Sequence, residues 1–214
     1  MNAEMLYTIL GGIQWTLALT VTALAIGVLL GAGLCAMRSC GIKALDLLAA
    51  CLILVLRAVP PIVWLFLIFF GIGTGWFEVS PFQAAALGLG LITAANMAEI
   101  FRGSLAAVHR GQWEAARALS MPARYRLLDV IAPQLLRVSL PSIATYAIGL
   151  LKDTAIASTI GVSEIAFQAT HVSQTSFRGL ETFAFAGLLY IALSIPVAWA
   201  SRWADQRMRL RVAR

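Results

Sequence analysis

Charged and amide side chains within long apolar runs are the residues of this sequence best suited to binding a small polar molecule. Arg57 lies in one apolar run, and Lys152 and Asp153 lie in another. A charge inside a membrane is costly, so it usually faces a water-filled cavity or a partner. Arg57 suits a carboxylate, Asp153 suits an ammonium group, and Asn96 is a weaker candidate in a third run. These residues are candidates to line a path for a polar solute.

Each of these residues also has a structural interpretation. Lys152 and Asp153 are adjacent, so on a helix they point about 100° apart and can pair with different neighbours. Lys152 can also extend to the membrane interface, and Arg57 can bind a lipid phosphate. Glu99 and Arg102 are one helical turn apart, which predicts a structural ion pair.

No arrangement of residues predicts catalysis, a metal site or a cofactor on this chain. The nucleotide-binding signature GxxxxGK[ST] is absent, so ATP and Mg²⁺ are not expected here. His109 and His171 have no nucleophile or cysteine at a useful spacing. The three cysteines lie in or beside apolar runs with no CxxC or Cys/His spacing, so we expect neither a disulfide nor a zinc site.

The composition predicts an integral membrane protein. The chain is 60% hydrophobic and 12% charged, with a mean hydropathy of +0.85. Its net charge of +6 does not indicate nucleic-acid binding, because the arginines sit at the ends of apolar runs. The N-terminus has no basic region and no small-residue cleavage site, so we expect no removable signal peptide.

The apolar runs predict an all-α fold, a single transmembrane domain over residues 1–214. Five helices are expected at about 6–37, 45–70, 82–101, 140–162 and 183–203. Gly27 and Gly31 form a GxxxG pair, which either admits a close neighbour or only relieves crowding. Pro60-Pro61 should bend or break the second helix. Trp76, in the following loop, suits the membrane interface.

The distribution of basic residues predicts the orientation. Five helices put the two termini on opposite sides. One side holds nearly all of the basic residues between the runs, and the other holds Arg178 against several glutamates: the first group is Arg38, Lys43, Arg102, Arg110, Arg117, Arg124, Arg126, Arg137 and the C-terminal tail. By the positive-inside rule the N-terminus is outside, and both the C-terminus and the loop 104–137 are cytoplasmic.

The longest polar interruption, Gly111 to Pro133, reads GQWEAARALSMPARYRLLDVIAP. Its periodicity predicts two short amphipathic helices with a break at Ser120-Met121-Pro122, where Pro122 suits the first turn of the second helix. A basic amphipathic stretch often lies simply on the membrane surface. This one resembles the EAA loop of ABC importer permeases, placed here between helices 3 and 4.

In that family the loop forms the coupling helices that dock into a groove on a cytoplasmic ATPase. The resemblance implies a coupling role for a set of residues in this loop: Gly111, Trp113, Glu114, Ala115, Ala116, Leu119, Ser120 and Pro133. The chain departs from the family at two positions. Ser120 stands where the family has its turn glycine, and Ala132 stands where it has a leucine before the proline.

The flanking residues resemble the polar amino acid uptake branch of the family, and the resemblance covers nearly the whole chain. It is carried by AEIFRG at 98–103, LKDT at 151–154 and IGV at 160–162. The family's RGTP-like segment corresponds to RAVP at 57–60 and its KDTS-like segment to KDTA at 152–155. This match adds Thr154 to the residues expected along the substrate path.

The resemblance also implies the partners. They are two ATPase subunits that carry ATP and Mg²⁺, a second permease subunit (identical or paralogous), an extracytoplasmic binding protein and a polar amino acid, in a bacterial inner membrane. A stand-alone channel or ion-coupled carrier is the alternative. It predicts an internal inverted repeat, and none is convincing. A third possibility is a scaffold that only recruits an ATPase.

Overall fold

The computed structural model of this chain describes residues 2–72 and 78–210, and every regular element within them is helical. Trp76, expected at the interface, lies outside the described residues. The first half contains five α-helices and one π-helical turn: α1 (Ala3–Gly11), α2 (Ile13–Ser39), α3 (Lys43–Ala58), α4 (Pro61–Phe66), the π turn η1 (Leu67–Ile72) and α5 (Pro81–Ala106).

The second half begins with the polar segment and ends with a long apolar helix. Its elements are α6 (Arg110–Ala118), α7 (Ala123–Tyr125), the π turn η2 (Arg126–Ile131), α8 (Ala132–Asp153), the 3₁₀ helix η3 (Thr154–Ile160), α9 (Ile165–Ser176) and α10 (Gly179–Leu210). The all-helical prediction is confirmed. Several bounds differ: α8 begins at Ala132 rather than near 140, α5 continues to Ala106, and helix α9 lies between the last two predicted helices.

Four helical stretches are long and apolar enough to cross a membrane, namely Ala3–Ser39, Pro81–Ala106, Ala123–Ile160 and Gly179–Trp203. A fifth candidate is the pair Lys43–Ala58 and Pro61–Gly71, which is bent by 100°. The break falls at Pro60-Pro61, as predicted, because proline lacks the N–H that would continue the helical hydrogen bonds. The second predicted helix is therefore two helices.

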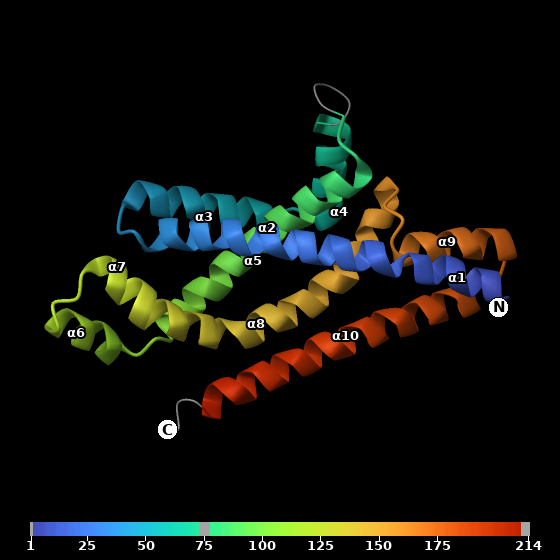
Figure 1. Cartoon of the computed structure of the whole chain (residues 1–214). Coiled ribbons are helices and arrows are strands. Elements are labelled where there is room, and N and C mark those ends of the chain that lie inside the picture. Colours follow the sequence, from blue (N-terminus) through green and yellow to red (C-terminus); the bar gives the residue numbers. More distant parts are fainter. Residues whose placement is uncertain (1, 73–77, 211–214) are drawn as a thin grey trace.

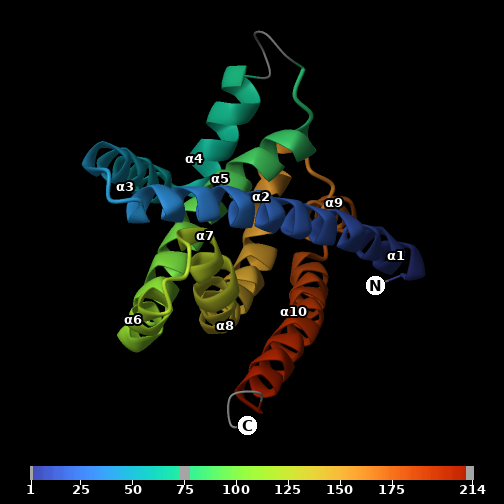
Figure 2. The same ribbon diagram turned by 60° about the vertical axis from the view of Figure 1, so that its left-hand side comes forward.

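The helices form an elongated bundle (Figure 1). Helices α1 and α9 pack together at one end, whereas α6, α7 and the last turns of α10 lie at the other. Helix α4 projects steeply from the bundle in both views (Figures 1 and 2). The polar 110–131 segment and the end of α10 therefore lie at the opposite end of the bundle from the start of α1.

The closest helix contact is between α2 and α5, and it depends on the GxxxG pair. A Cβ at Gly27 would overlap the Thr93 side chain, and a Cβ at Gly31 would lie 2.6 Å from the Cβ of Met97. Any larger residue would force the two backbones apart. This confirms the close-approach interpretation of Gly27 and Gly31.

The outer face of α10 is apolar and exposed. Leu188, Ile191, Ile195 and Trp199 recur at helical spacing, and each is more than half exposed, up to 70% at Trp199. Large apolar patches of this kind mark surfaces that contact lipid or another protein rather than water.

Candidate functional site

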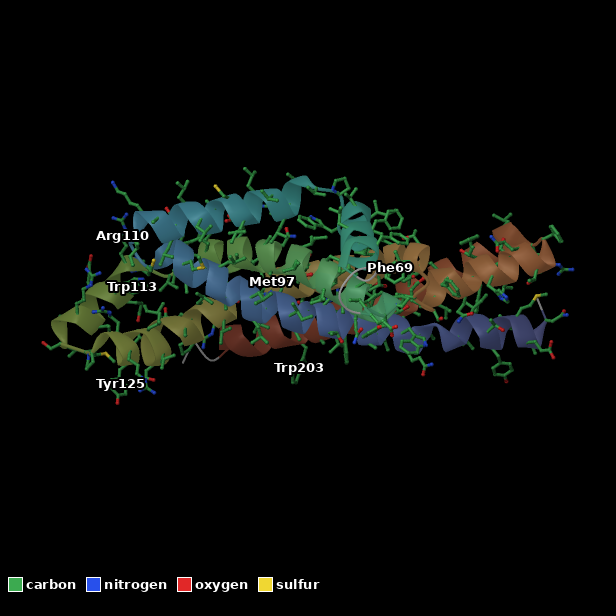
Figure 3. The ribbon with its side chains drawn as sticks, turned by 90° about the horizontal axis from the view of Figure 1, so that it is seen from above. Phe69, Met97, Arg110, Trp113, Tyr125 and Trp203 are labelled. Carbon is green, nitrogen blue, oxygen red and sulfur yellow. The ribbon has the colours of Figure 1, made fainter. Side chains whose placement is uncertain are left out.

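The predicted coupling segment forms a compact polar tip at one end of the bundle. Helix α6 leads into a turn, then α7 and η2 return to α8, and Figure 3 shows Arg110, Trp113 and Tyr125 at this tip. The first turn of α6 is capped by His109, whose Nδ1 accepts a hydrogen bond from Gly111 N at 3.1 Å. His109 therefore has a local structural partner.

The turn after α6 is a Schellman motif with serine at its left-handed position. Ser120 has a φ of 53°. Ser120 N donates to Arg117 O at 2.8 Å, and Met121 N donates to Ala116 O at 3.1 Å. These two bonds satisfy carbonyls at the end of the helix, and the motif usually carries glycine at this position. Pro122 precedes α7 as its N-cap, one residue earlier than predicted.

The expected coupling residues divide between an outer and an inner face of the tip. Glu114, Ala115, Leu119, Ser120 and Pro133 are exposed, with Leu119 at 76%. Ala116 is buried, and Gly111 and Trp113 are half-buried. The outer set combines a carboxylate with a protruding leucine.

An apolar cavity of about 590 Å³ separates α6 from the bundle. Trp113 lines it from α6, Leu127 from η2, Leu135 from α8, and Cys35 and Phe101 from α2 and α5. Because the cavity replaces close packing, α6 is attached to the membrane helices mainly through η2.

Pro133 accounts for the irregular start of α8. It stands in the first turn of α8, directly after the π turn η2. A proline inside a helix removes one hydrogen-bond donor and its ring crowds the carbonyl four residues earlier. The chain instead makes a wider turn, in which Ala132 N donates to Leu127 O, five residues back.

Arg57 lies in a groove between α3 and α5. It is exposed and lines a cavity of about 380 Å³ with Ala50, Ile53, Leu54, Ala58 and Glu99. The groove is largely apolar and contains both a cation and an anion. Glu99, which also pairs with Arg102, gives the groove a second charge.

Lys152 lies on a different face of the bundle from Arg57. It lines a cavity of about 510 Å³ between α8 and α10, with Tyr190 and Ser194 among otherwise apolar residues. Asp153 is exposed at the end of α8, and within the described residues no ion pair joins it to Lys152. In the part of the chain that the structure describes, Arg57 and Lys152 therefore line separate cavities.

Thr154 and Asn96 make internal hydrogen bonds. Thr154 is fully buried, and its hydroxyl donates to Leu151 O at 2.7 Å. The Asn96 amide donates to Ile92 O at 2.9 Å and to the Tyr146 hydroxyl at 3.4 Å. The Tyr146 hydroxyl in turn donates to Thr93 Oγ1 at 3.3 Å, so Asn96 helps to hold α8 against α5.

Glu99 and Arg102 form the structural pair that their spacing predicts. Arg102 Nη2 lies 2.6 Å from Glu99 Oε2, and Arg102 Nε also donates to this carboxylate. The pair is on the last turns of α5, one loop before α6. It therefore lies next to the coupling segment, not in the cavity between α8 and α10.

The sequence did not identify Glu164 as an important residue, because its charge was counted with the solvated acids of a polar connection. In the structure it is fully buried and caps α9. Its carboxylate accepts hydrogen bonds from Ala166 N at 2.9 Å, Phe167 N at 2.7 Å and the Tyr190 hydroxyl at 2.5 Å. The apolar spacing of Ile165, Ala169 and Val172 is the signal that would have predicted a helix beginning here.

Burial raises the pKa of the Glu164 carboxyl above its ordinary value, and the bonds from Tyr190 and the two amides partly oppose that rise. The same corner is very close-packed, because a Cβ at Gly12 would lie 2.6 Å from Ile165 N. Ile165 N also donates to Thr16 Oγ1 at 3.2 Å. These contacts fix α9 against the first helices and against α10.

Comparison with known proteins agrees with this architecture. The family model described as binding-protein-dependent transport system inner membrane component matches residues 23–210. A probable amino-acid ABC transporter permease protein of Vibrio harveyi is 31% identical over 96% of this chain and 93% of its own length. An octopine transport system permease protein of Rhizobium radiobacter is 34% identical over 93% of this chain and 87% of its own.

Solved structures give the same result. The crystal structure of an amino acid ABC transporter with histidines aligns with a TM-score of 0.85 at 30% identity, over 97% of this chain and all of that chain. The inward-facing MetNI methionine ABC transporter aligns with a TM-score of 0.75 at 21% identity, which supports the fold alone. The chain belongs to the inner-membrane component family of binding-protein-dependent transport systems, the permease subunits of ABC importers.

Proposed function

We propose that this permease moves a polar amino acid, or a similar small zwitterion, into the cytoplasm of a bacterium. The observation that carries the proposal is the exposed α6–turn–α7 tip, where the EAA-type residues fold as two helices joined by a Schellman turn. The names of the similar amino-acid and octopine permeases support the substrate class.

The proposed orientation has the α6–α7 tip and the end of α10 in the cytoplasm and the start of α1 outside. Five crossings follow if α3 and α4 together count as one broken span. The excess of arginine and lysine near the tip supports this orientation, because basic residues are retained on the cytoplasmic side. The tip is then available to a cytoplasmic ATPase.

Two permease subunits, identical or homologous, would enclose one substrate path, with two ATPase subunits below and a binding protein above. The ATPases carry ATP and Mg²⁺, and this chain carries no cofactor. When the two ATPase subunits close on ATP, they would draw the two tips together and open the path outward, and ATP hydrolysis would reverse the change. The exposed apolar face of α10 supports a subunit or lipid contact there.

The substrate path is proposed to include Arg57, Asn96, Lys152, Asp153 and Thr154. Since Arg57 and Lys152 line separate cavities, a single solute would meet both only between two subunits or at different steps of transport. Asn96 and Thr154 would shape the path through their internal hydrogen bonds, and Arg57, Lys152 and Asp153 would supply charge.

The proposal is tested by purifying the chain from a membrane with its neighbouring gene products and reconstituting it in vesicles. We expect an ATPase subunit to co-purify and ATP hydrolysis to rise when binding protein and an amino acid mixture are present. Uptake without any ATPase would instead support a channel or carrier. A bound ATPase with no uptake would support a scaffold.

A further inference from the structure

The attachment of α6 to the rest of the permease is unusually sparse. Only Ala116 of this helix is buried, and a cavity lies beside Trp113. Helix α6 must nevertheless transmit force if the proposed coupling is correct. Its polar contacts with η2 and α8 therefore become important.

Gln134 makes two of these contacts with one amide group. Its Nε2 donates to Gln112 Oε1 on α6 at 3.1 Å and to Val130 O on η2 at 2.9 Å. An amide nitrogen carries two hydrogens, so both bonds can form together. Within the described residues, no other side-chain hydrogen bond or ion pair joins α6 to η2 or α8.

Gln134 lies at the start of α8, so its bond to Gln112 connects α6 directly to that helix. It follows Pro133 at the start of α8, where the π turn departs from regular helix geometry. Helix α8 has 22 residues and so is about 33 Å long. Lys152 and Asp153 stand at the far end of the same helix, beyond its internal Pro141, so α8 links Gln134 to the charged residues.

We propose that Gln134 is a positioning residue that latches the coupling helix α6 to α8, so that displacement of α6 by the ATPase moves α8. The inference rests on the proposed function, because it assumes that α6 meets an ATPase. The bond to Val130 O requires a donor at position 134, whereas the Gln112 amide can offer either its oxygen or its nitrogen. Loss of the latch leaves the ATPase-facing residues of α6 in place but weakens their connection to α8.

The test uses the full transporter in vesicles with binding protein, a mixture of radiolabelled amino acids and Mg-ATP. The measured quantity is amino acid taken up per ATP hydrolysed, together with ATPase co-purification. Gln134→Ala should lower this ratio about fivefold, the effect of one ordinary hydrogen bond, with co-purification unchanged. Gln174→Ala on α9, exposed and distant from the tip, is the matched control and should leave the ratio unchanged.

Two further variants test the donor chemistry. Gln134→Lys keeps donors for both oxygens and should retain at least half of the wild-type ratio. Gln134→Glu cannot donate to Val130 O, although the Gln112 amide can turn its nitrogen toward the carboxylate, so its ratio should lie between those of the alanine and lysine variants. A wild-type ratio in Gln134→Ala, or equal losses in the lysine and alanine variants, would overturn the latch.

The same experiment separates this inference from the proposed function. If the wild-type complex shows no uptake linked to hydrolysis, the proposed function fails before any variant is compared. If the wild-type complex couples normally and Gln134→Ala does also, only the latch fails.

Discussion

Replacing Ser120 by glycine should stabilise the permease. Ser120 holds a φ of 53°, in the left-handed region where a side chain is crowded by the following carbonyl oxygen. Glycine removes the Cβ and with it roughly 1 kcal/mol of strain. The two hydrogen bonds of the turn use backbone atoms of Ser120 and Met121, so they survive the substitution.

The expected change in free energy translates into a measurable shift in melting temperature. For a chain of about this size, 1 kcal/mol corresponds to roughly 2–4 °C. The assay is thermal unfolding of the purified protein in detergent, followed by tryptophan fluorescence. Ser120 is exposed, so the substitution does not change core packing.

Two matched variants isolate the cause of the shift. Ser120→Ala removes the hydroxyl but keeps the Cβ, so it should not raise the melting temperature. Ala115→Gly places glycine within regular helix on an exposed position of α6 and should cost about 1 kcal/mol. If Ser120→Gly lowers the melting temperature as Ala115→Gly does, the turn is not left-handed in the folded protein and our account of it is wrong.

Three further variants test other parts of the structure. Gly27→Ala should destabilise the protein by about 1–3 kcal/mol in thermal unfolding, because the new Cβ overlaps Thr93; a loss no larger than in a substitution at an open glycine would contradict the α2–α5 contact. The charge reversal Glu114→Lys, exposed on α6, should abolish ATPase co-purification while the melting temperature is retained, and normal co-purification would remove Glu114 from the interface. Burial raises the folded-state pKa of Glu164, so this group favours folding at low pH, and its contribution falls as pH rises from the ordinary carboxyl pKa through the raised value. Tyr190→Phe removes a bond that stabilises the charged form of Glu164, so it should lower the melting temperature more at pH 8 than at pH 5. Equal losses at the two pH values would show that the Tyr190 hydroxyl does not favour the charged carboxylate.

Several features of the fold could be predicted because they depend on local sequence. Apolar length and composition indicated helices that cross a membrane, and Pro60-Pro61 indicated the break between α3 and α4. The Ser120 turn could be located because helix periodicity stops there on both sides. Gly27 and Gly31 indicated a close helix neighbour, although not that the neighbour is α5.

The two short helices and the turn of residues 111–133 were predictable for the same reason, since their pattern is contiguous. The candidate substrate residues were identified by type, as charges within apolar runs, but their grouping was not determined by the sequence. Arg57 and Lys152 look equivalent on that criterion. The packing of the helices puts Arg57 between α3 and α5 and Lys152 between α8 and α10.

The remaining features arise from contacts between residues far apart in the chain. Glu164 is a surface acid by sequence, and its burial depends on Tyr190 and Gly12 arriving from other helices. The bond between Gln112 and Gln134 forms only because α6 folds back beside η2 after the Ser120 turn. Sequence periodicity fixes which side of a helix is apolar, but the energy of each such contact depends on a distance that only the packed helices set.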